Sequence, residues 1–433
     1  MWWIYQAVLA AGLLGVAPWL LARRGRHYLP TLRGRLARDP GTASLTPGRL
    51  WIHAVSVGEA AVAAALAARL PADLPCLVTT ITPTGQARAR AGLAGLGPRA
   101  EVAYLPFDLG PLVERFLRRH EPAALVLVEG DYWPLLLARV RRRDVPVRVV
   151  NGRFSDRSFP RLHRARTLVR RLLLDRVDLF GVQSALDRER LRALGVPEER
   201  IVVTGNLKFD FPEPPELPAL SSLLARWSAG RPILVAGSTM SGEESAVLAA
   251  YIQARGPGRA LLLLAPRHPD RFDAVWELVR AQFPAAIRRS SAERSGPSSP
   301  PVVLLDSIGE LASVYRGAAA AFVGGTLSGT GGHNPIEPAR FGVPVAAGPS
   351  MENFREIAEQ FDRDEAWSRV RDDQELGRLW GRFLDEPGTG RAIGERGRLL
   401  IAANRGAIER TLELLKPLFE LVRRAQAAQG ATP

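Results

Sequence analysis

The feature that most constrains the fold is a regular alternation of short apolar runs and helix-forming segments, which starts near Leu50. Apolar runs of about four to six residues are typical of strands buried on both faces of a parallel sheet. A βαβ alternation of this kind predicts helices that cover both faces of that sheet. The first series has strand-like runs at 51–54, 76–80, 101–104, 124–128, 145–150, 179–182 and 201–204.

A proline-rich break, EPPELP at residues 213–218, separates this series from a second one. Prolines at this density are typical of a linker, and 433 residues exceed the length of one ordinary domain. The sequence therefore predicts an α/β protein of two αβα domains, joined by one linker, with a cleft between them. The second series has strand-like runs at 232–236, 260–265, 302–305, 320–323 and 343–346.

The first 22 residues carry no charged side chain, and three arginines follow between residues 23 and 26. As a helix this segment is long enough to span the hydrocarbon core of a bilayer, which is about 30 Å thick. The positive-inside rule then places the rest of the chain in the cytoplasm, behind a membrane anchor. The aromatic residues between positions 2 and 5, together with Pro18, leave open a helix that lies in the membrane interface. Packing against the protein itself is the other alternative.

The formal net charge of +14 predicts an anionic partner: nucleic acid, acidic lipid or a phosphorylated substrate. The densest basic stretch, Arg157–Arg176, favours an anionic membrane surface over nucleic acid, because few aromatic side chains in it could stack on bases. The single Cys76 excludes a disulfide framework and a cysteine zinc site. The six histidines have no metal-ligand spacing, so no metal site is expected.

Polar residues follow several predicted strand ends, and Glu59 is the first of them. It stands at the start of a helix, where the helix N-terminus favours an ionised carboxylate. It also follows the carboxyl end of a strand, where open α/β sheets bind their ligands. A first-turn capping role without chemistry is an equally good interpretation of this local pattern.

Two carboxylates, Glu129 and Asp131, follow a very apolar strand and are costly there unless they are paired or solvated. Arg153 and Asp156 are expected on the same rim of the sheet. Lys208 is one of only two lysines in a chain that otherwise uses arginine. Its ammonium is suited to meeting a departing phosphate, and a solvated hinge lysine is the alternative.

In the second series, Arg267 follows a strand and is placed to meet a phosphate or a carboxylate. The glycines between positions 324 and 332 would let a nucleotide approach the backbone, and the helix expected near Pro335 could bind anionic oxygens. Glu337, one turn further on, could accept ribose hydroxyls. The Asp362–Asp364 stretch spells DxD but is expected to be a solvated helix face.

Six motifs, spaced through the chain, together resemble the 3-deoxy-D-manno-octulosonic acid (Kdo) transferases of Gram-negative bacteria. The resemblance implies a GT-B fold, in which two Rossmann-like domains face each other across a cleft. It also implies inverting transfer of Kdo from CMP-Kdo to a lipid A precursor (lipid IVA), in lipopolysaccharide core biosynthesis, without metal or cofactor. The motifs are WIHAVSVGE (51–59), TPTG (82–85), YLPFDL (104–109), VTGNLKFD (203–210), PRHPDRF (266–272) and GGHNPIEPA (331–339).

Carried over to the matching positions, the resemblance makes Glu59 the general base, and Glu129 and Lys208 the groups that stabilise the transition state. It implies a membrane anchor at 1–25, an acceptor-binding domain at 26–212, a CMP-Kdo-binding domain at 213–405, and a C-terminal helix and tail at 406–433. The residues implied to hold CMP are Pro266, Arg267, Ile308, Gly309, Glu310, Asn334, Pro335, Ile336 and Glu337.

The chain departs from the family pattern in two places. Residues 130–134 read GDYWP where the family usually has TELWP, and residues 240–241 read MS where it typically has HE. The key acidic and basic positions are intact, so we expect an active enzyme at the inner membrane with its catalytic domains on the cytoplasmic side. The alternatives are another membrane-associated GT-B enzyme that uses a different sugar nucleotide, and a basic, membrane-tethered binding protein without catalysis.

Overall fold

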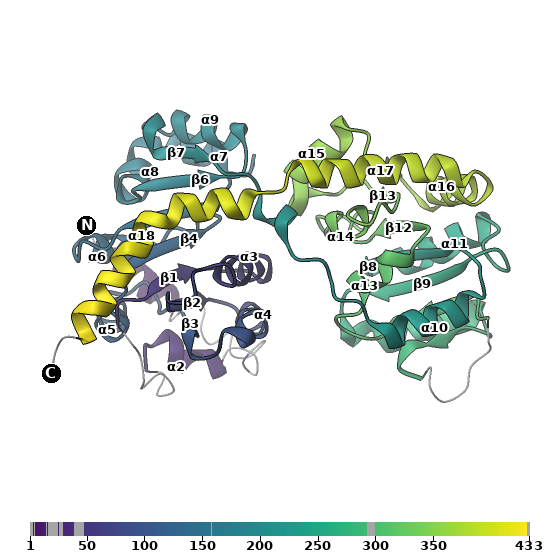
Figure 1. Cartoon of the computed structure of the whole chain (residues 1–433), viewed down its shortest axis with the longest axis horizontal. Coiled ribbons are helices and arrows are strands. Elements are labelled where there is room, and N and C mark those ends of the chain that lie inside the picture. Colours follow the sequence, from purple (N-terminus) through teal and green to yellow (C-terminus); the bar gives the residue numbers. More distant parts are fainter. Residues whose placement is uncertain are drawn as a thin grey trace. The chain divides into compact units, whose positions relative to one another are not determined.

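The computed structural model describes residues 3, 5–13, 15, 25, 29–38, 47–156, 158–291 and 299–430. The chain divides into two compact units: the first contains residues 1–212 and 405–433, and the second contains residues 213–404. Each unit is built on a seven-stranded parallel sheet flanked by helices (Figure 1). The prediction of two α/β domains with parallel sheets is confirmed.

The sheet of the first unit has the order β3-β2-β1-β4-β5-β6-β7. After β1 the chain adds β2 and β3 on one side of it, and then crosses over to add β4 on the other side. Loops at the carboxyl ends of β1 and β4 therefore diverge at a topological switch point, where open α/β sheets bind ligands. The strands are β1 (Leu50–His53), β2 (Cys76–Thr80), β3 (Ala100–Tyr104), β4 (Ala124–Val128), β5 (Val147–Gly152), β6 (Leu179–Val182) and β7 (Ile201–Val203).

Helices pack on both faces of this sheet because successive strand residues point to opposite sides. In β1, Ile52 packs into the core on one face and Trp51 into the core on the other, and both are fully buried. Ser56, Thr82 and Ser184 each cap a following helix by accepting a backbone hydrogen bond. The helices are α2 (Leu32–Arg35), α3 (Val57–Ala67), α4 (Pro83–Leu93), α5 (Gly110–His120), α6 (Pro134–Arg141), α7 (Phe159–Arg164), α8 (Arg166–Leu172) and α9 (Ala185–Ala193).

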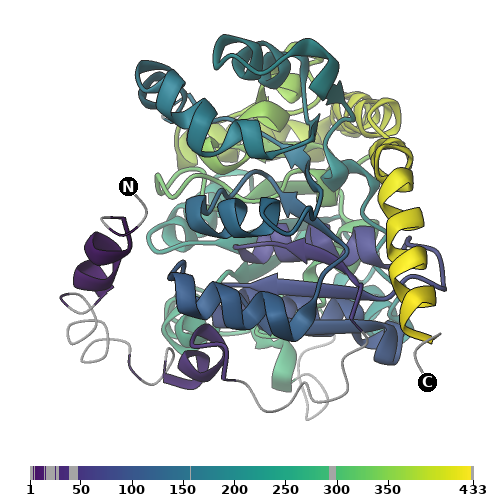
Figure 2. The same ribbon diagram turned by 90° about the vertical axis from the view of Figure 1, so that its left-hand side faces the viewer.

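The C-terminal helix α18 (Ala407–Gly430) belongs to the first unit, although it follows the whole second unit in sequence. Its N-terminus is capped by Asp210, whose carboxylate accepts hydrogen bonds from the backbone of Gly406 (2.8 Å) and Ile408 (2.7 Å). Its apolar face, including Leu415 and Leu418, is buried in the same core as α3 and α4. Figure 2 shows α18 in yellow, beside the first sheet.

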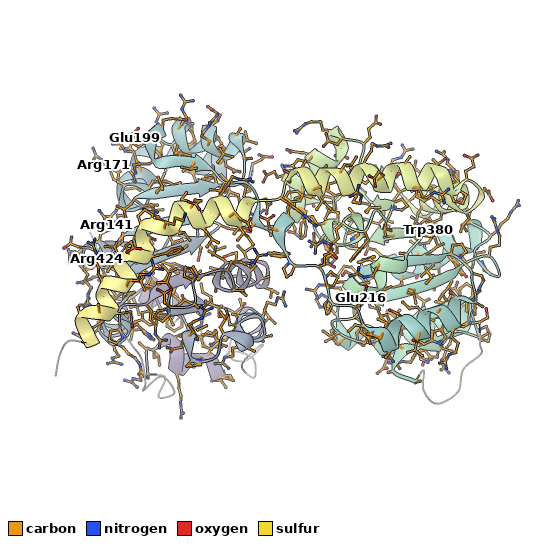
Figure 3. All side chains as sticks on the ribbon, viewed as in Figure 1. Arg141, Arg171, Glu199, Glu216, Trp380 and Arg424 are labelled. Carbon is orange, nitrogen blue, oxygen red and sulfur yellow. The ribbon has the colours of Figure 1, made fainter. Side chains whose placement is uncertain are left out.

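The sheet of the second unit has the order β10-β11-β9-β8-β12-β13-β14. Its two edge strands, β10 (Ile287–Arg288) and β14 (Ser368–Arg369), were not predicted, because two residues give no apolar run. Trp380 lies fully buried in this unit (Figure 3). The other strands are β8 (Ile233–Thr239), β9 (Leu261–Pro266), β11 (Val302–Leu304), β12 (Ala320–Val323) and β13 (Val345–Ala347). The helices are α10 (Pro218–Ser228), α11 (Glu243–Gln253), α12 (Phe272–Gln282), α13 (Leu311–Val314), α14 (Ile336–Ala339), α15 (Arg355–Arg363), α16 (Asp373–Asp385) and α17 (Pro387–Ala403).

About half of the expected membrane anchor, residues 1–25, lies outside the described residues. Within the described part of the chain, no helix is long and apolar enough to cross a membrane. Residues 5–13 are helical, and two of their side chains contact the first unit. Tyr5 donates a hydrogen bond to Asp108 Oδ2 (2.8 Å), and Gln6 Oε1 accepts one from the backbone of Gly110 (2.8 Å).

Candidate active site

Glu59 forms a reciprocal cap at the N-terminus of α3. Its backbone N–H donates to Ser56 Oγ (3.2 Å), and its carboxylate accepts hydrogen bonds from that hydroxyl (2.8 Å) and from the backbone of Val55 (2.8 Å). The arrangement resembles a capping box, except that the carboxylate accepts from the backbone of Val55, one residue before the N-cap, so Glu59 does cap this helix. The carboxylate is nevertheless partly exposed, which leaves room for a second role.

The pKa of Glu59 is raised above its ordinary value, chiefly because the carboxyl is partly buried. The hydrogen bonds from Val55 and Ser56 act in the opposite direction, and the negative charges of Glu129 and Asp131 raise the pKa further. The helix N-terminus was expected to favour the ionised form. Burial and the neighbouring carboxylates act in the opposite direction, and the local sequence showed neither of them.

Glu129 directly follows β4 and is held by three side chains. Its backbone has φ = 60° and the next residue, Gly130, has φ = 97°, so both residues lie in the left-handed region. Lys208 Nζ lies 3.1 Å from Oε1, Asn151 Nδ2 donates to Oε1 (3.2 Å), and Arg153 Nε donates to Oε2 (2.8 Å). Burial opposes ionisation, yet the charges of Lys208 and Arg153 outweigh it and hold the pKa of Glu129 below its usual value.

Lys208 lies on a short 3₁₀ helix, Leu207–Asp210, that follows β7. Its side chain is only 13% exposed and is paired with Glu129, so the alternative of a solvated hinge lysine is wrong. Because the charge of Glu129 also acts on Glu59, the structure brings together all three residues predicted to do chemistry. They lie in the segments that follow β1, β4 and β7, at the carboxyl edge of one sheet.

His53, the last residue of β1, was not among the predicted site residues. It is fully buried, with Nδ1 2.9 Å from Thr79 Oγ1 and Nε2 3.7 Å from Asp131 Oδ2. The same Asp131 oxygen accepts a hydrogen bond from Trp133 Nε1 (2.7 Å). The sequence did contain a sign that His53 lies near the site: it is a histidine in an otherwise apolar strand, six residues before Glu59.

In the second unit, the carboxylate of Glu243 accepts four backbone hydrogen bonds while only 1% exposed. The turn after β8 supplies one donor, Met240 N (2.8 Å), and the loop after β12 supplies three. These are Gly325 N (2.7 Å), Leu327 N (2.8 Å) and Ser328 N (3.1 Å). Glu243 therefore fixes the shape of the glycine-rich loop, a function that its position at a helix start did not reveal.

Two arginines of the PRHPDRF motif have different surroundings. Arg271 forms a bidentate pair with the buried carboxylate of Glu244, at 2.6 and 2.9 Å. Arg267 is exposed, and its guanidinium makes no hydrogen bond or ion pair with any described residue. Burial lowers the pKa of His333 to about 4, and the charge of Arg267 acts in the same direction, which places Arg267 close to the GGHNPIEPA motif.

The other predicted donor-site residues also follow strand ends of the second sheet. Asn334 Oδ1 accepts a hydrogen bond from the backbone of Ile336 (3.1 Å), and its Nδ2 donates to Glu337 Oε1 (3.3 Å). Glu310 is held by Arg289 (2.9 Å), whereas Ile308 is 81% exposed. The remaining predicted residues of these segments are Pro266 at the end of β9, Gly309 with φ = 92°, and Pro335 before α14.

The DxD stretch and the basic stretch are both surface features. Asp362 pairs with Arg369 (2.9 Å) and accepts a hydrogen bond from Trp367 Nε1 (2.6 Å), at the end of α15. Arg171 lies at the outer surface of the first unit (Figure 3). No group of three potential metal ligands occurs among the residues that the structure describes. The exposed arginines on α7 and α8 are Arg161, Arg164, Arg166, Arg170 and Arg171, and Arg157 lies outside the described residues.

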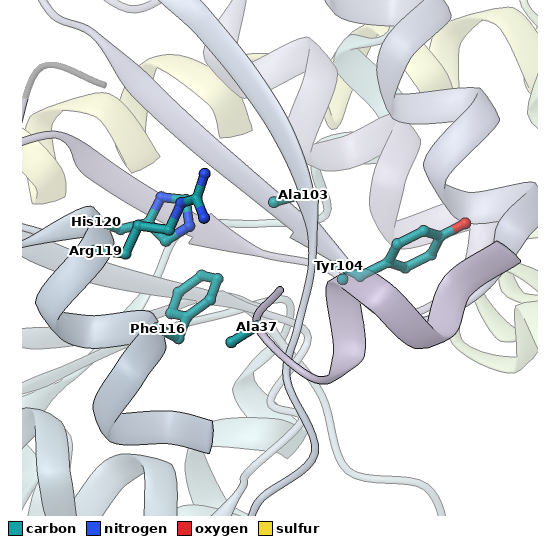
Figure 4. A pocket seen from close by; sticks show the side chains of 7 residues that line it. Ala37, Ala103, Tyr104, Phe116, Arg119 and His120 are labelled. Carbon is teal, nitrogen blue, oxygen red and sulfur yellow. The ribbon is translucent and has the colours of Figure 1, made fainter. Parts of the chain in front are cut away.

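A small pocket opens on the first unit between α2, β3 and α5 (Figure 4). His120 stacks on Phe116 there, with ring centroids 4.2 Å apart. Burial, assisted by the charges of Arg119 and Arg49, lowers the pKa of His120 to about 4, so the ring is neutral at physiological pH. None of the predicted site residues lines this pocket, and we assign it to packing.

Solved structures with bound UDP or UDP-GlcNAc share this architecture. The UDP-GlcNAc 2-epimerase of Neisseria meningitidis, solved with UDP-GlcNAc, superimposes with a TM-score of 0.58 over 85% of this chain and 100% of its own, at 11% identity. The Anabaena protein Alr3699/HepE, solved with UDP, gives a TM-score of 0.54 over 86% of this chain and 99% of its own, at 16% identity. Likeness at such low identity shows the fold alone, and that fold is GT-B.

Sequence comparisons define the class within this fold as glycosyltransferase. Residues 30–211 match the family model described as 3-deoxy-D-manno-octulosonic-acid transferase (kdotransferase). The 3-deoxy-D-manno-octulosonic acid transferase of Haemophilus influenzae is 35% identical over 90% of this chain and 93% of its own length. That of Bordetella pertussis is 35% identical over 95% of this chain and 99% of its own. The chain belongs to the 3-deoxy-D-manno-octulosonic acid (Kdo) transferase family.

Proposed function

We propose that this enzyme transfers Kdo from CMP-Kdo to a hydroxyl of a lipid A precursor (lipid IVA), with inversion and without a metal. The acceptor oxygen attacks the anomeric carbon of Kdo, the bond from that carbon to the phosphate oxygen breaks, and CMP leaves with the electron pair. The observation that carries the proposal is the convergence of Glu59, Glu129 and Lys208 at the switch point of the first sheet, in a member of this family.

Glu59 would accept the proton of the attacking hydroxyl. A general base is effective when its pKa is raised towards the working pH, while it stays deprotonated there. Its partial burial and the nearby charges of Glu129 and Asp131 act in this direction. The hydrogen bonds from Ser56 and Val55 would hold the carboxylate in one orientation.

Glu129 and Lys208 would stabilise the transition state. As Kdo leaves the phosphate, positive charge develops on the sugar and negative charge on the departing CMP. A buried ion pair supplies one group of each sign without reorganisation during the reaction. The low pKa of Glu129 means that this carboxylate is ionised throughout the physiological pH range.

The second unit would bind the donor. Arg267 has an exposed guanidinium without a partner among the described residues, and a charge-assisted bond to the CMP phosphate would give it one. The loops that hold CMP would be those at the carboxyl edge of this sheet. They comprise Pro266, Arg267, Ile308, Gly309, Glu310, Asn334, Pro335, Ile336 and Glu337.

The first unit would bind the acceptor at a membrane surface. The exposed arginines of α7 and α8 carry a charge opposite to that of lipid phosphates and of a phosphorylated acceptor. We place the enzyme at the inner membrane with its catalytic units on the cytoplasmic side, and we assign the anchor to residues 1–25. Nucleic acid is not among the partners proposed.

The deciding experiment is a product mass spectrum after incubation with CMP-Kdo and a tetraacylated lipid A precursor, without added metal. We expect the acceptor to gain one or more Kdo units while CMP is released. UDP-sugars tested in parallel should give no product. Transfer from a UDP-sugar instead of CMP-Kdo would establish the alternative of another GT-B enzyme, and nucleic-acid binding without any transfer would contradict both enzymatic interpretations.

A further inference from the structure

Three side-chain amides are buried side by side at the carboxyl ends of successive strands in the first unit. They are Asn151 at the end of β5, Gln183 directly after β6, and Asn206 after β7, and each is less than one-tenth exposed. The strands β4, β5, β6 and β7 are neighbours in this order, and the amides stand at the ends of the three strands that follow β4, the strand directly before Glu129. We call these three residues the amide chain.

Asn151 contacts the carboxylate of Glu129 and the backbone next to Lys208. Its Nδ2 donates to Glu129 Oε1 (3.2 Å), which is the same oxygen that Lys208 approaches at 3.1 Å. Its Oδ1 accepts a hydrogen bond from the backbone of Leu207 (3.0 Å), immediately before Lys208. One side chain thus holds the carboxylate and also the backbone that carries the ammonium.

The other two amides form a second chain of hydrogen bonds, which runs from the backbone of Asn151 to the backbone of Lys208. Gln183 Nε2 donates to the carbonyl of Asn151 (2.9 Å), and Asn206 Nδ2 donates to Gln183 Oε1 (2.9 Å). Asn206 Oδ1 then accepts a hydrogen bond from the backbone of Lys208 (3.1 Å). Each amide therefore uses both its donor and its acceptor, which is what buried polar networks require.

The backbone at position 151 also favours asparagine. Asn151 has φ = 54°, at the irregularity where the register of β5 against β6 shifts. Among residues with a side chain, asparagine and aspartate tolerate this conformation best. Of these two, only asparagine offers a donor to Glu129 together with an acceptor for Leu207 N.

From this geometry we propose that Asn151 is a positioning residue, which holds Glu129 and Lys208 in the arrangement required for Kdo transfer. The inference rests on the proposed function for the meaning of that arrangement. Coulomb attraction alone would not fix it, because lysine is a compact charge on a flexible four-carbon stem. Gln183 and Asn206 support Asn151 by immobilising the same segment.

The first test is a double-mutant cycle measured by Kdo transfer. Asn151→Asp keeps the acceptor for Leu207 N but places an oxygen against Glu129, so we expect kcat to fall about 10- to 100-fold, with the KM for CMP-Kdo within about twofold. In a Glu129→Gln background the same change should cost less than twofold, because the introduced glutamine amide can donate to the new carboxylate. Equal losses in both backgrounds would show a structural role only and would overturn the proposal.

The second test needs no activity, because the chain has only two lysines, Lys208 and Lys416. Lys416 is 63% exposed and serves as an internal standard for amine-specific labelling measured by peptide mass spectrometry. We expect Asn151→Gly, which keeps the backbone conformation and removes both hydrogen bonds, to raise the labelling rate of Lys208 at least fivefold relative to Lys416. An unchanged ratio would overturn the proposal.

The control for both tests is Asn404→Asp, a matched change at the end of α17, where the amide donates to the carbonyl of Leu400 (2.9 Å). It should leave both the rate and the labelling ratio unchanged. If the wild-type enzyme transferred no Kdo, the proposed function would fail, whereas the labelling ratio would still decide whether Asn151 positions Lys208.

Discussion

At the scale of single residues, Glu59 combines a structural and a chemical role, and substitution can separate them. Glu59→Gln retains an oxygen that can accept the hydrogen bond from Val55 N, but it removes the base. We expect kcat to fall about 10²- to 10⁴-fold, the usual contribution of general base catalysis, while the affinity for CMP stays within about twofold. Steady-state kinetics and calorimetric titration with CMP measure the two effects. Retention of most of the rate would make Glu59 a helix cap only.

The pH dependence of the rate tests the same residue through its neighbour Asp131. A base works only when deprotonated, so activity is lost as the pH falls through the pKa of Glu59, which is raised. Removing the negative charge in Asp131→Asn lowers that pKa, and the acid limb of kcat/KM should therefore move to lower pH. The hydrogen bond from Trp133 Nε1 can be retained by the asparagine oxygen. If the acid limb did not move, the charge of Asp131 would have no effect on the pKa of the base, and the prediction would be wrong.

Substitution of Arg267 should weaken donor binding, whereas substitution of Arg271 should lower stability. Arg267→Ala removes an exposed guanidinium, so we expect the KM for CMP-Kdo to rise about 10- to 100-fold, as for a charge-assisted hydrogen bond, with unchanged stability. Arg271→Ala leaves the buried Glu244 unpaired and should lower the free energy of unfolding by about 3–5 kcal/mol. Urea denaturation and initial-rate kinetics distinguish the two. Similar effects of both changes would contradict the assignment of Arg267 to the donor site.

At the scale of elements, the sequence allowed most strands to be predicted, because buried parallel strands are continuous apolar runs. The edge strands β10 and β14 were missed for lack of such a run. The motif residues could be placed at strand ends, but their partners could not. That Asn151 reaches Glu129, and that Glu243 reaches the loop after β12, depends on sheet order and loop conformation, which leave no local signal.

The carboxylate of Glu243 holds the glycine-rich loop after β12 through three backbone hydrogen bonds, and a substitution can test this role. Each carboxylate oxygen of Glu243 accepts two backbone hydrogen bonds. In Glu243→Gln an NH₂ group takes the place of one of these oxygens and cannot accept them. We expect the free energy of unfolding to fall by about 2–5 kcal/mol, and the affinity for CMP to fall with it as the glycine-rich loop loosens. Glu277→Gln, in an exposed pair with Arg280, is the matched control and should change stability by less than about 1 kcal/mol. If Glu243→Gln were destabilised but bound CMP with unchanged affinity, the glycine-rich loop would not be part of the donor site.

At the scale of the whole molecule, the first unit is completed by a helix that the chain supplies only after the second unit. Leu418 of α18 is 1% exposed in the core of the first unit, whereas Leu421 on the same helix is 39% exposed. We expect Leu418→Ala to destabilise the first unit by about 2–5 kcal/mol and Leu421→Ala by less than about 1 kcal/mol. Hydrogen exchange followed by mass spectrometry locates the effect. Amides of β1 and β4 should exchange faster in Leu418→Ala while those of β8 and β12 do not change, because the two units have separate cores. Equal acceleration in both sheets would mean that the two units unfold as one, and the C-terminal helix would then stabilise the whole enzyme and not the first unit alone.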